Sequence, residues 1–191
     1  MDLAHYLVGE IKSVSCLTAN FIKERPLPGE GAATFSAGVG GAAARGAVTV
    51  EDASLMMVEF ANGALGSFEA TRFAPGRKNR NTFEIYGSDG SLVFDLERMN
   101  ELQFYSRGDP EYAQGFRNIL ATESCHPYIK HWWPPGHIIG YEHEFTHAVV
   151  DFVEAIAGGG AIEPNFRDGV KCIRVLEAGL KSAASGRKEL I

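Results

Sequence analysis

The sequence of 191 residues lacks the features that direct a protein to nucleic acid, to a membrane or to an oxidising compartment. It carries 18 Lys and Arg against 24 Asp and Glu, so its net charge is -6, and this balance disfavours nucleic acid as a partner. No stretch approaches the roughly 20 apolar residues that span a bilayer, and charges interrupt the start where a signal peptide would be apolar. The three cysteines (Cys16, Cys125 and Cys172) are odd in number and far apart, which favours a reducing cytoplasm over a disulfide framework.

Motifs for nucleotide binding and for a catalytic nucleophile are also missing. The run Gly38-Val39-Gly40-Gly41 lacks the third glycine of G-x-G-x-x-G, and no predicted strand leads into it. The nucleophile pattern G-x-S-x-G does not occur. We therefore expect no cofactor-binding residues in this chain and assign none.

What the sequence does contain is a series of antiparallel strands followed by helices. Alternating apolar residues and turn signals such as Asn62-Gly63 predict strands at 12–25, 53–60, 64–73, 82–86, 91–95 and 102–105. Apolar stripes predict helices at 141–157 and 167–184, the second with a stop at Gly186. This order predicts an α+β fold, in which helices pack on one face of an open, mostly antiparallel sheet.

The remaining segments are read as connections. Residues 26–47, with their Gly- and Ala-rich run, are predicted to form a flexible arm, and residues 106–136 a loop with a short strand. Residues 1–9 are typical of the tail of a helix that ends at Gly9, with no capping residue before it. We therefore expect a single domain over 1–191, cut from a longer chain.

One five-residue pattern points to metal chemistry. His143-Glu144-Phe145-Thr146-His147 matches H-E-x-x-H on a predicted helix, where the spacing places both imidazoles on one face and the glutamate as a general base. A catalytic zinc needs a third ligand, but Val150 and Val153 stand where a further histidine would be sought. A zinc-dependent hydrolase is therefore kept as an alternative, with no metal ligand assigned.

A group of aromatic and polar residues is the other candidate site. Aromatic faces pack on the C–H patches of sugars, and Asn, Arg and His make directed hydrogen bonds to hydroxyl groups. The candidate substrate-binding residues are Arg72, Arg77, Asn79, Trp132, Trp133, His137 and Tyr141.

Four segments together resemble the C-terminal domain of the glucose–fructose oxidoreductase/inositol 2-dehydrogenase (Gfo/Idh/MocA) family. They are DLAHYLVGEIKSV at 2–14, VTVEDASLMMVEFANGALGSFEATRFAPGRKN at 48–79, FEIYGSDGSLVFDLERMNEL at 83–102 and GHIIGYEHEFTHAVVDFVEAIAGG at 136–159. The likeness covers nearly the whole chain and is weakest at 26–47 and 106–130. The GRKN segment and the Trp-Trp-Pro-Pro-Gly-His loop look most like the inositol and anhydrosugar dehydrogenase branch.

The resemblance implies a division of labour. In the family an N-terminal Rossmann domain holds NAD or NADP and supplies a catalytic lysine, while the C-terminal domain supplies a D-x-x-x-H motif, the substrate pocket and a free sheet face that forms dimers or tetramers. Both the lysine segment and that motif would fall before Met1. Asp2 matches the aspartate that follows the motif's histidine, and the pair Asp2 and His5 is spaced one residue short, so we assign no catalytic residue.

The resulting prediction is the substrate-binding and oligomerisation domain of an NAD(P)-dependent sugar or polyol dehydrogenase that acts on CH–OH groups. By itself the chain is expected to be inactive, to hold no cofactor and to form a homo-oligomer. Besides the zinc hydrolase, a non-catalytic pairing module is the other alternative.

Overall fold

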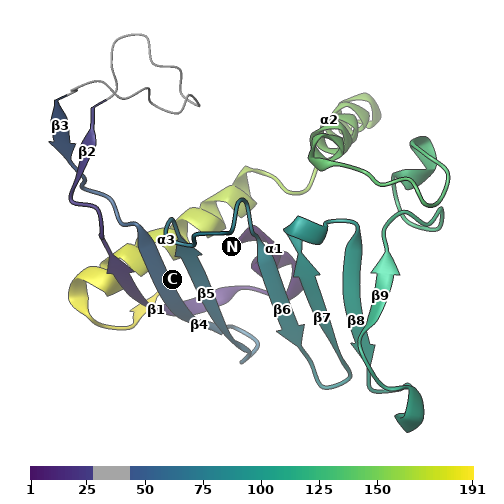
Figure 1. Cartoon of the computed structure of the whole chain (residues 1–191), viewed down its shortest axis with the longest axis horizontal. Helices are drawn as coiled ribbons and strands as arrows, with labels where there is room; N and C mark the ends of the chain where they lie inside the picture. The colour runs from purple at the N-terminus through teal and green to yellow at the C-terminus, as the bar shows by residue number, and fades with distance from the viewer. Residues whose placement is uncertain (28–43) are drawn as a thin grey trace. The chain divides into compact units, whose positions relative to one another are not determined.

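The computed structural model describes residues 1–27 and 44–191 and divides the chain into two compact units. Unit 1 comprises 1–75 and 164–191, and unit 2 comprises 76–163. The predicted arm at 26–47 lies largely outside the described residues. The α+β class and the mostly antiparallel pairing are confirmed, and the strands form two four-stranded sheets, one in each unit, with a short two-stranded ladder in unit 1 (Figure 1).

Unit 1 is built on a sheet with the strand order β10-β1-β4-β5, in which every pairing is antiparallel. Its strands and helices have the following bounds: α1 Asp2–Leu7, β1 Ile11–Ala19, β2 Glu24–Pro26, β3 Arg45–Ala47, β4 Ala53–Phe60, β5 Leu65–Thr71, α3 Phe166–Ser185 and β10 Glu189–Leu190. The predicted turn between β4 and β5 is present: Gly63 has φ +89°, and the Asn62 side chain accepts a hydrogen bond from the Ala64 N–H at 3.0 Å.

The core of unit 1 lies between β1, β4 and α3. Val14 on β1 and Val175 on α3 are both fully buried. Gly179 lets α3 approach β4 closely, because a Cβ there would lie 3.1 Å from the Met56 sulfur. α3 ends where the sequence predicted, at Gly186, whose left-handed φ of +68° caps the helix.

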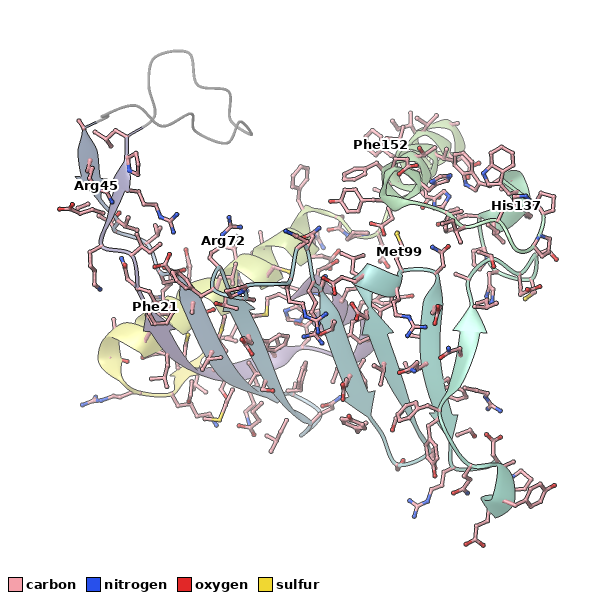
Figure 2. All side chains as sticks on the ribbon, in the orientation of Figure 1. Phe21, Arg45, Arg72, Met99, His137 and Phe152 are labelled. Carbon is pink, nitrogen blue, oxygen red and sulfur yellow. The ribbon has the colours of Figure 1, made fainter. Side chains whose placement is uncertain are left out.

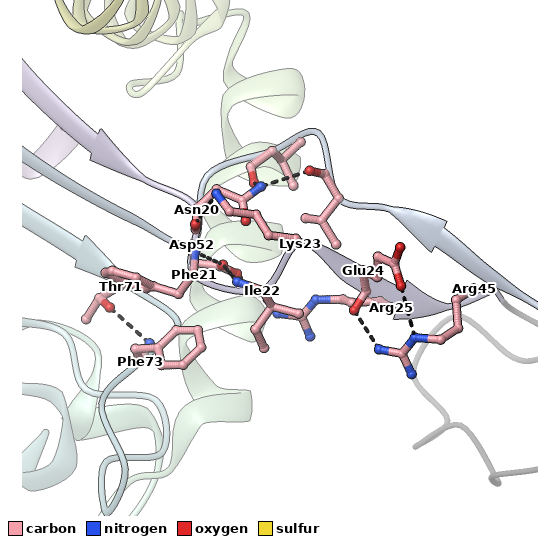
Figure 3. Close-up of polar contacts among 12 residues, drawn as sticks. Asn20, Phe21, Ile22, Lys23, Glu24, Arg25, Arg45, Asp52, Thr71 and Phe73 are labelled. Carbon is pink, nitrogen blue, oxygen red and sulfur yellow. Dashed lines mark hydrogen bonds and ion pairs between the residues drawn. The ribbon is translucent and has the colours of Figure 1, made fainter.

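A buried carboxylate fixes the chain where it leaves β1 toward β2 and β3 (Figure 3). Asp52 accepts hydrogen bonds from the backbone N–H groups of Phe21 at 2.8 Å and Ile22 at 2.9 Å, and from the Arg25 guanidinium at 3.1 Å. These hydrogen bonds, that of Ile22 first, lower the pKa of the Asp52 carboxyl despite its burial, which acts in the opposite direction. The predicted strand over 12–25 is therefore divided: β1 ends at Ala19, and β2 begins only at Glu24.

Unit 2 is a sheet of strand order β6-β7-β8-β9, again antiparallel throughout. Its elements have the following bounds: β6 Thr82–Tyr86, β7 Gly90–Asp95, β8 Glu101–Ser106, β9 Arg117–Leu120, the short 3-10 turns Leu96–Arg98, Glu111–Ala113 and Ile129–His131, and α2 Tyr141–Gly158. One sheet face carries the aromatic pair Phe83 and Phe94, whose ring centroids lie 5.3 Å apart. The loop between β9 and α2, residues 121–140, leads into the helix and carries three of the seven candidate site residues.

None of the helices described over 1–27 and 44–191 combines the length and the hydropathy needed to cross a membrane.

Candidate functional site

The predicted substrate-binding residues fall into three places. Trp132, Trp133, His137 and Tyr141 lie together on the loop that precedes α2 and on the first turn of that helix, all within unit 2. Figure 2 shows His137 on this loop.

Arg77 and Asn79 belong to the segment that opens unit 2, ahead of β6, and Arg72 follows β5 in unit 1. The Arg77 guanidinium donates to the Glu97 carboxylate at 2.7 Å, so this side chain already has a partner of opposite charge. Arg72 and Asn79 are exposed. Of the four residues on the loop and at the start of α2, the structure brings Trp133 and His137 into direct contact.

The first turn of α2 is fixed by a histidine. The Nδ1 atom of His143 accepts a hydrogen bond from the backbone N–H of Gly140 at 3.0 Å, and the His143 N–H donates to the Gly140 carbonyl at 3.1 Å. A side chain at the third helical position that accepts from the N-cap N–H is one half of a capping box, and the other half is missing because glycine has no side chain. His143 thus has a structural role at the helix start.

Side chains on the following turns of α2, on the same face as His143, bind residues of the preceding loop. The Trp132 indole N–H donates to Nε2 of His147 at 2.7 Å, and the Trp132 ring lies edge-on to His143 with 4.3 Å between centroids. Tyr128 stacks on His147 at 4.4 Å, and its hydroxyl donates to the Asp151 carboxylate at 2.8 Å.

The hydrogen bond to Asp151 raises the pKa of the Tyr128 phenol. Partial burial of the phenol and the negative charges of Asp151 and Glu154 act in the same direction. The phenol therefore remains a hydrogen-bond donor over the whole neutral pH range.

Trp133, His137 and Tyr141 remain available for a ligand. Trp133 is 54% exposed, and its ring stacks loosely on His137 with 6.3 Å between centroids. The Nδ1 atom of His137 lies 3.0 Å from the Pro134 carbonyl, which fixes the ring orientation. Tyr141 is half exposed and packs edge-on against Phe145. This arrangement provides aromatic faces and a free imidazole nitrogen, which are groups that bind sugars.

The geometry does not favour zinc at the H-E-x-x-H pattern. A neutral imidazole has one acceptor nitrogen, and both acceptors are occupied: Nδ1 of His143 by Gly140 and Nε2 of His147 by Trp132. Over residues 1–27 and 44–191, no group of three or more His, Cys, Asp or Glu is placed to hold a metal ion. The structure assigns the two histidines to helix capping and to loop packing.

Sequence reasoning missed Tyr128 and Asp151. Tyr128 has φ +67°, and no pattern in the sequence marks a tyrosine for the left-handed region. Asp151 follows His147 by four residues, as His147 follows His143, and this spacing on one helix face was the available signal.

A dinucleotide does not fit the described part of the chain. Its site needs a strand that runs through a glycine-rich turn into a helix, within a parallel sheet. All strand pairs formed by residues 1–27 and 44–191 are antiparallel, and α2 and α3 each begin after a loop. We therefore derive no step of a reaction through a nucleotide held by these residues.

A hollow of about 140 Å³ lies elsewhere in unit 2, and the charged side chains that line it include Glu84 on β6, Arg98 on the 3-10 turn after β7, and Glu101 on β8. None of the predicted site residues lines it. The hollow is consequently separate from the loop 121–140, which carries Trp132 and Trp133.

Comparison with known proteins defines the class. The profile of the oxidoreductase family, C-terminal alpha/beta domain (GFO_IDH_MocA_C), matches residues 1–190. The chain therefore belongs to the Gfo/Idh/MocA oxidoreductases and corresponds to their C-terminal domain, which confirms the resemblance found in the sequence.

Within this family, the chain is similar to several individual proteins of known structure or function. Levoglucosan dehydrogenase of Pseudarthrobacter phenanthrenivorans is 43% identical over 185 residues, which are 96% of this chain and 47% of that protein. An oxidoreductase domain protein from Kribbella flavida has a TM-score of 0.89 at 49% identity, covering all of this chain and 47% of its own. A levoglucosan dehydrogenase in complex with NADH and levoglucosan has a TM-score of 0.85 at 40% identity, with 100% and 47% covered. The chain spans about half the length of the relatives it matches.

Proposed function

We propose that this chain is the substrate-side domain of an NAD-dependent dehydrogenase that oxidises a hydroxyl group of a cyclic sugar, with levoglucosan as the first substrate to test. The observation that carries the proposal is the 43% identity to levoglucosan dehydrogenase over 96% of the chain. Related structures hold NADH together with levoglucosan or with L-sorbose. NAD, when bound, accepts the hydride from the carbinol carbon.

The residues of this chain bind and orient the sugar in this proposal. Trp133 and Tyr141 offer flat apolar faces to the C–H side of a pyranose ring, and His137 offers a hydrogen-bonding nitrogen to a hydroxyl group. Arg77 and Asn79 are proposed as further hydroxyl ligands from the segment before β6. Trp132 acts differently, because its N–H is used by His147.

The absence of a fit for a dinucleotide supports a division of labour. The described residues offer no strand-turn-helix site, and the matched relatives are about twice as long as the chain. The cofactor and the proton-transferring residues are therefore proposed to lie in the part of the enzyme that this chain does not span. The chain alone is accordingly inactive.

We also propose that the chain forms a homo-oligomer through the sheet of unit 1. On the sheet of unit 1, the face opposite α3 carries Leu17, Leu55 and Met57, which are at least half exposed. Leu17 and Leu55 are direct cross-strand partners, so they form a continuous apolar surface. Light scattering after size exclusion tests this: Leu55→Lys is expected to reduce the mass to that of a monomer, whereas Tyr112→Lys in unit 2 leaves it unchanged.

A hybrid enzyme tests the catalytic proposal. This chain replaces the matching 47% of the P. phenanthrenivorans levoglucosan dehydrogenase, and NADH formation is followed by absorbance. We expect turnover of levoglucosan by the hybrid, none by the chain alone, and a KM raised about tenfold or more by Trp133→Ala, the loss of one aromatic contact with the sugar. Tyr112→Ala, which removes an exposed aromatic of the 3-10 turn Glu111–Ala113 and not of the loop 121–140, is the matched control.

Two results contradict the proposal. The first is binding of NADH to the 191-residue chain with micromolar affinity, which would place the cofactor site within it. The second is a folded hybrid that binds NADH but turns over no sugar or polyol.

A further inference from the structure

One face of α2 carries a row of polar side chains that all serve the preceding loop. His143, His147 and Asp151 are spaced four residues apart and so lie on one side of the helix. Their partners on the loop are Tyr128 and Trp132, at the two ends of the short 3-10 turn Ile129–His131. The loop is therefore attached to the helix at both ends of this turn.

The backbone at Tyr128 is strained. Among the described residues it is the non-glycine residue with positive φ, at +67°. A bulky residue in this region persists only where its surroundings hold it there, and such strain is found at functional sites. Here the stacking on His147 and the hydrogen bond to Asp151 hold the side chain, while the next residue, Ile129, is 1% exposed.

The attachment at Trp132 depends on the state of His147. An indole N–H can only donate, so Nε2 of His147 is the acceptor and its proton lies on Nδ1. Trp132 is thus fixed by one hydrogen bond and by the edge contact with His143. The residue that follows, Trp133, is about half exposed and stacks on His137.

We propose that His147 and Asp151 are positioning residues, which hold the loop 128–133 on α2 so that Trp133 presents its ring to the sugar in one orientation. The inference rests on the proposed function, and adds to it two residues that do not themselves touch the substrate. A ring that is already oriented loses less conformational freedom when a sugar stacks on it, so the attachment increases affinity.

A role confined to folding predicts a different pattern from positioning. If the cluster only stabilises unit 2, its variants lower the free energy of unfolding, and sugar affinity is unchanged in the fraction that remains folded. If it positions the loop, affinity falls in the folded protein, and a variant that keeps the hydrogen-bond acceptor recovers it.

The test compares Asp151→Ala, Asp151→Asn and Tyr128→Phe in the hybrid enzyme, with Tyr112→Phe as the control. The amide oxygen of Asp151→Asn still accepts from the Tyr128 hydroxyl. We expect Asp151→Ala and Tyr128→Phe to raise the KM for levoglucosan about tenfold, the worth of one hydrogen bond to a charged group. The Kd for NADH stays unchanged, and Asp151→Asn lies within about threefold of the unaltered hybrid.

A second measurement uses the 191-residue chain alone. It has two tryptophans, so its indole N–H groups give two signals in a proton–nitrogen NMR spectrum, and Trp133→Phe identifies each. We expect the Trp132 indole proton to exchange slowly with solvent, to exchange at least tenfold faster in His147→Ala, and to be slowed again in His147→Gln, whose side-chain oxygen can accept.

The outcomes separate the two proposals. The positioning role is overturned if the hybrid is active and all three variants keep the KM of the unaltered hybrid. It is also overturned if the indole proton of Trp132 exchanges as fast as that of Trp133. Either result leaves the proposed function intact. A hybrid that binds NADH but acts on no sugar overturns the proposed function and, with it, the positioning role.

Discussion

Removal of the Ser182 hydroxyl tests how unit 1 is closed at the edge of its sheet. β10 pairs with β1 only at Ser13 and Val14, so the N–H of Cys16 on that side has no strand partner. The Ser182 Oγ accepts from this N–H at 2.9 Å and donates to the Arg187 carbonyl at 2.6 Å. Ser182 is 2% exposed, so water does not replace the hydroxyl without rearrangement.

The magnitude follows from the two hydrogen bonds. Leaving a buried donor without a partner costs about 1–3 kcal/mol, and the higher helix propensity of alanine returns roughly 0.5 kcal/mol. Ser182→Ala is therefore expected to lower the free energy of unfolding by about 1–2 kcal/mol. The loss arises at the contact of α3 with β1 and not from a changed surface.

Urea unfolding followed by circular dichroism measures the effect, with the midpoint lowered and the slope with urea unchanged. Ser185→Ala is the control on the same helix, because the Ser185 hydroxyl is exposed and water can replace the hydrogen bonds that it makes with the Arg187 N–H and the Glu189 carboxylate. A destabilisation by Ser182→Ala no larger than that of Ser185→Ala would refute the reasoning. It would show that β1 does not depend on this hydroxyl for its edge.

Three further predictions concern burial, pH and the start of α2. Val175→Ala deletes two fully buried methyl groups and is expected to lower the free energy of unfolding by about 2 kcal/mol in the same urea assay. The pKa of Asp52 is lowered by hydrogen bonds from Ile22 and Arg25, so its contribution is complete above about pH 4 and is lost as the pH falls through the lowered value; in Asp52→Asn, the fall in melting temperature between pH 5 and 2 should be smaller. His143→Ala removes the capping contact and should destabilise α2 by about 1 kcal/mol, whereas added Zn²⁺ leaves the melting temperature of the unaltered chain unchanged.

The parts of the fold that follow local chemistry were predictable from the sequence. Three elements were found where expected: the Asn62-Gly63 turn, the strand Thr82–Tyr86 and the end of α3 at Gly186. Each is indicated by residues that are neighbours in the sequence. The strand Glu189–Leu190 was missed. Two residues carry no alternation, and their pairing is decided by β1, which lies far away in the sequence.

Tertiary contacts set the rest of the fold. The division of the strands into two sheets depends on which edges pair, and nothing in the alternation of a single strand specifies its neighbour. Likewise, the end of β1 at Ala19 results from Asp52, whose carboxylate takes the N–H groups of Phe21 and Ile22 that a continuing strand would have used. The sequence of that segment favours a strand, but its N–H groups bind the buried Asp52 carboxylate and so cannot pair with a neighbouring strand.

The candidate site shows the same limit in chemical form. A spacing of four residues on a helix indicates only that the side chains share a face. Such a face can bind zinc, and it can equally bind a loop that packs on it. What separates the two is the use of each acceptor nitrogen. Zinc needs the lone pairs of His143 and His147, and both are directed to N–H donors, one from Gly140 and one from Trp132. Since Trp132 lies outside the helix, its contribution becomes visible only once the loop is folded. A helix motif of this kind is therefore interpretable only together with the segment that packs against its face.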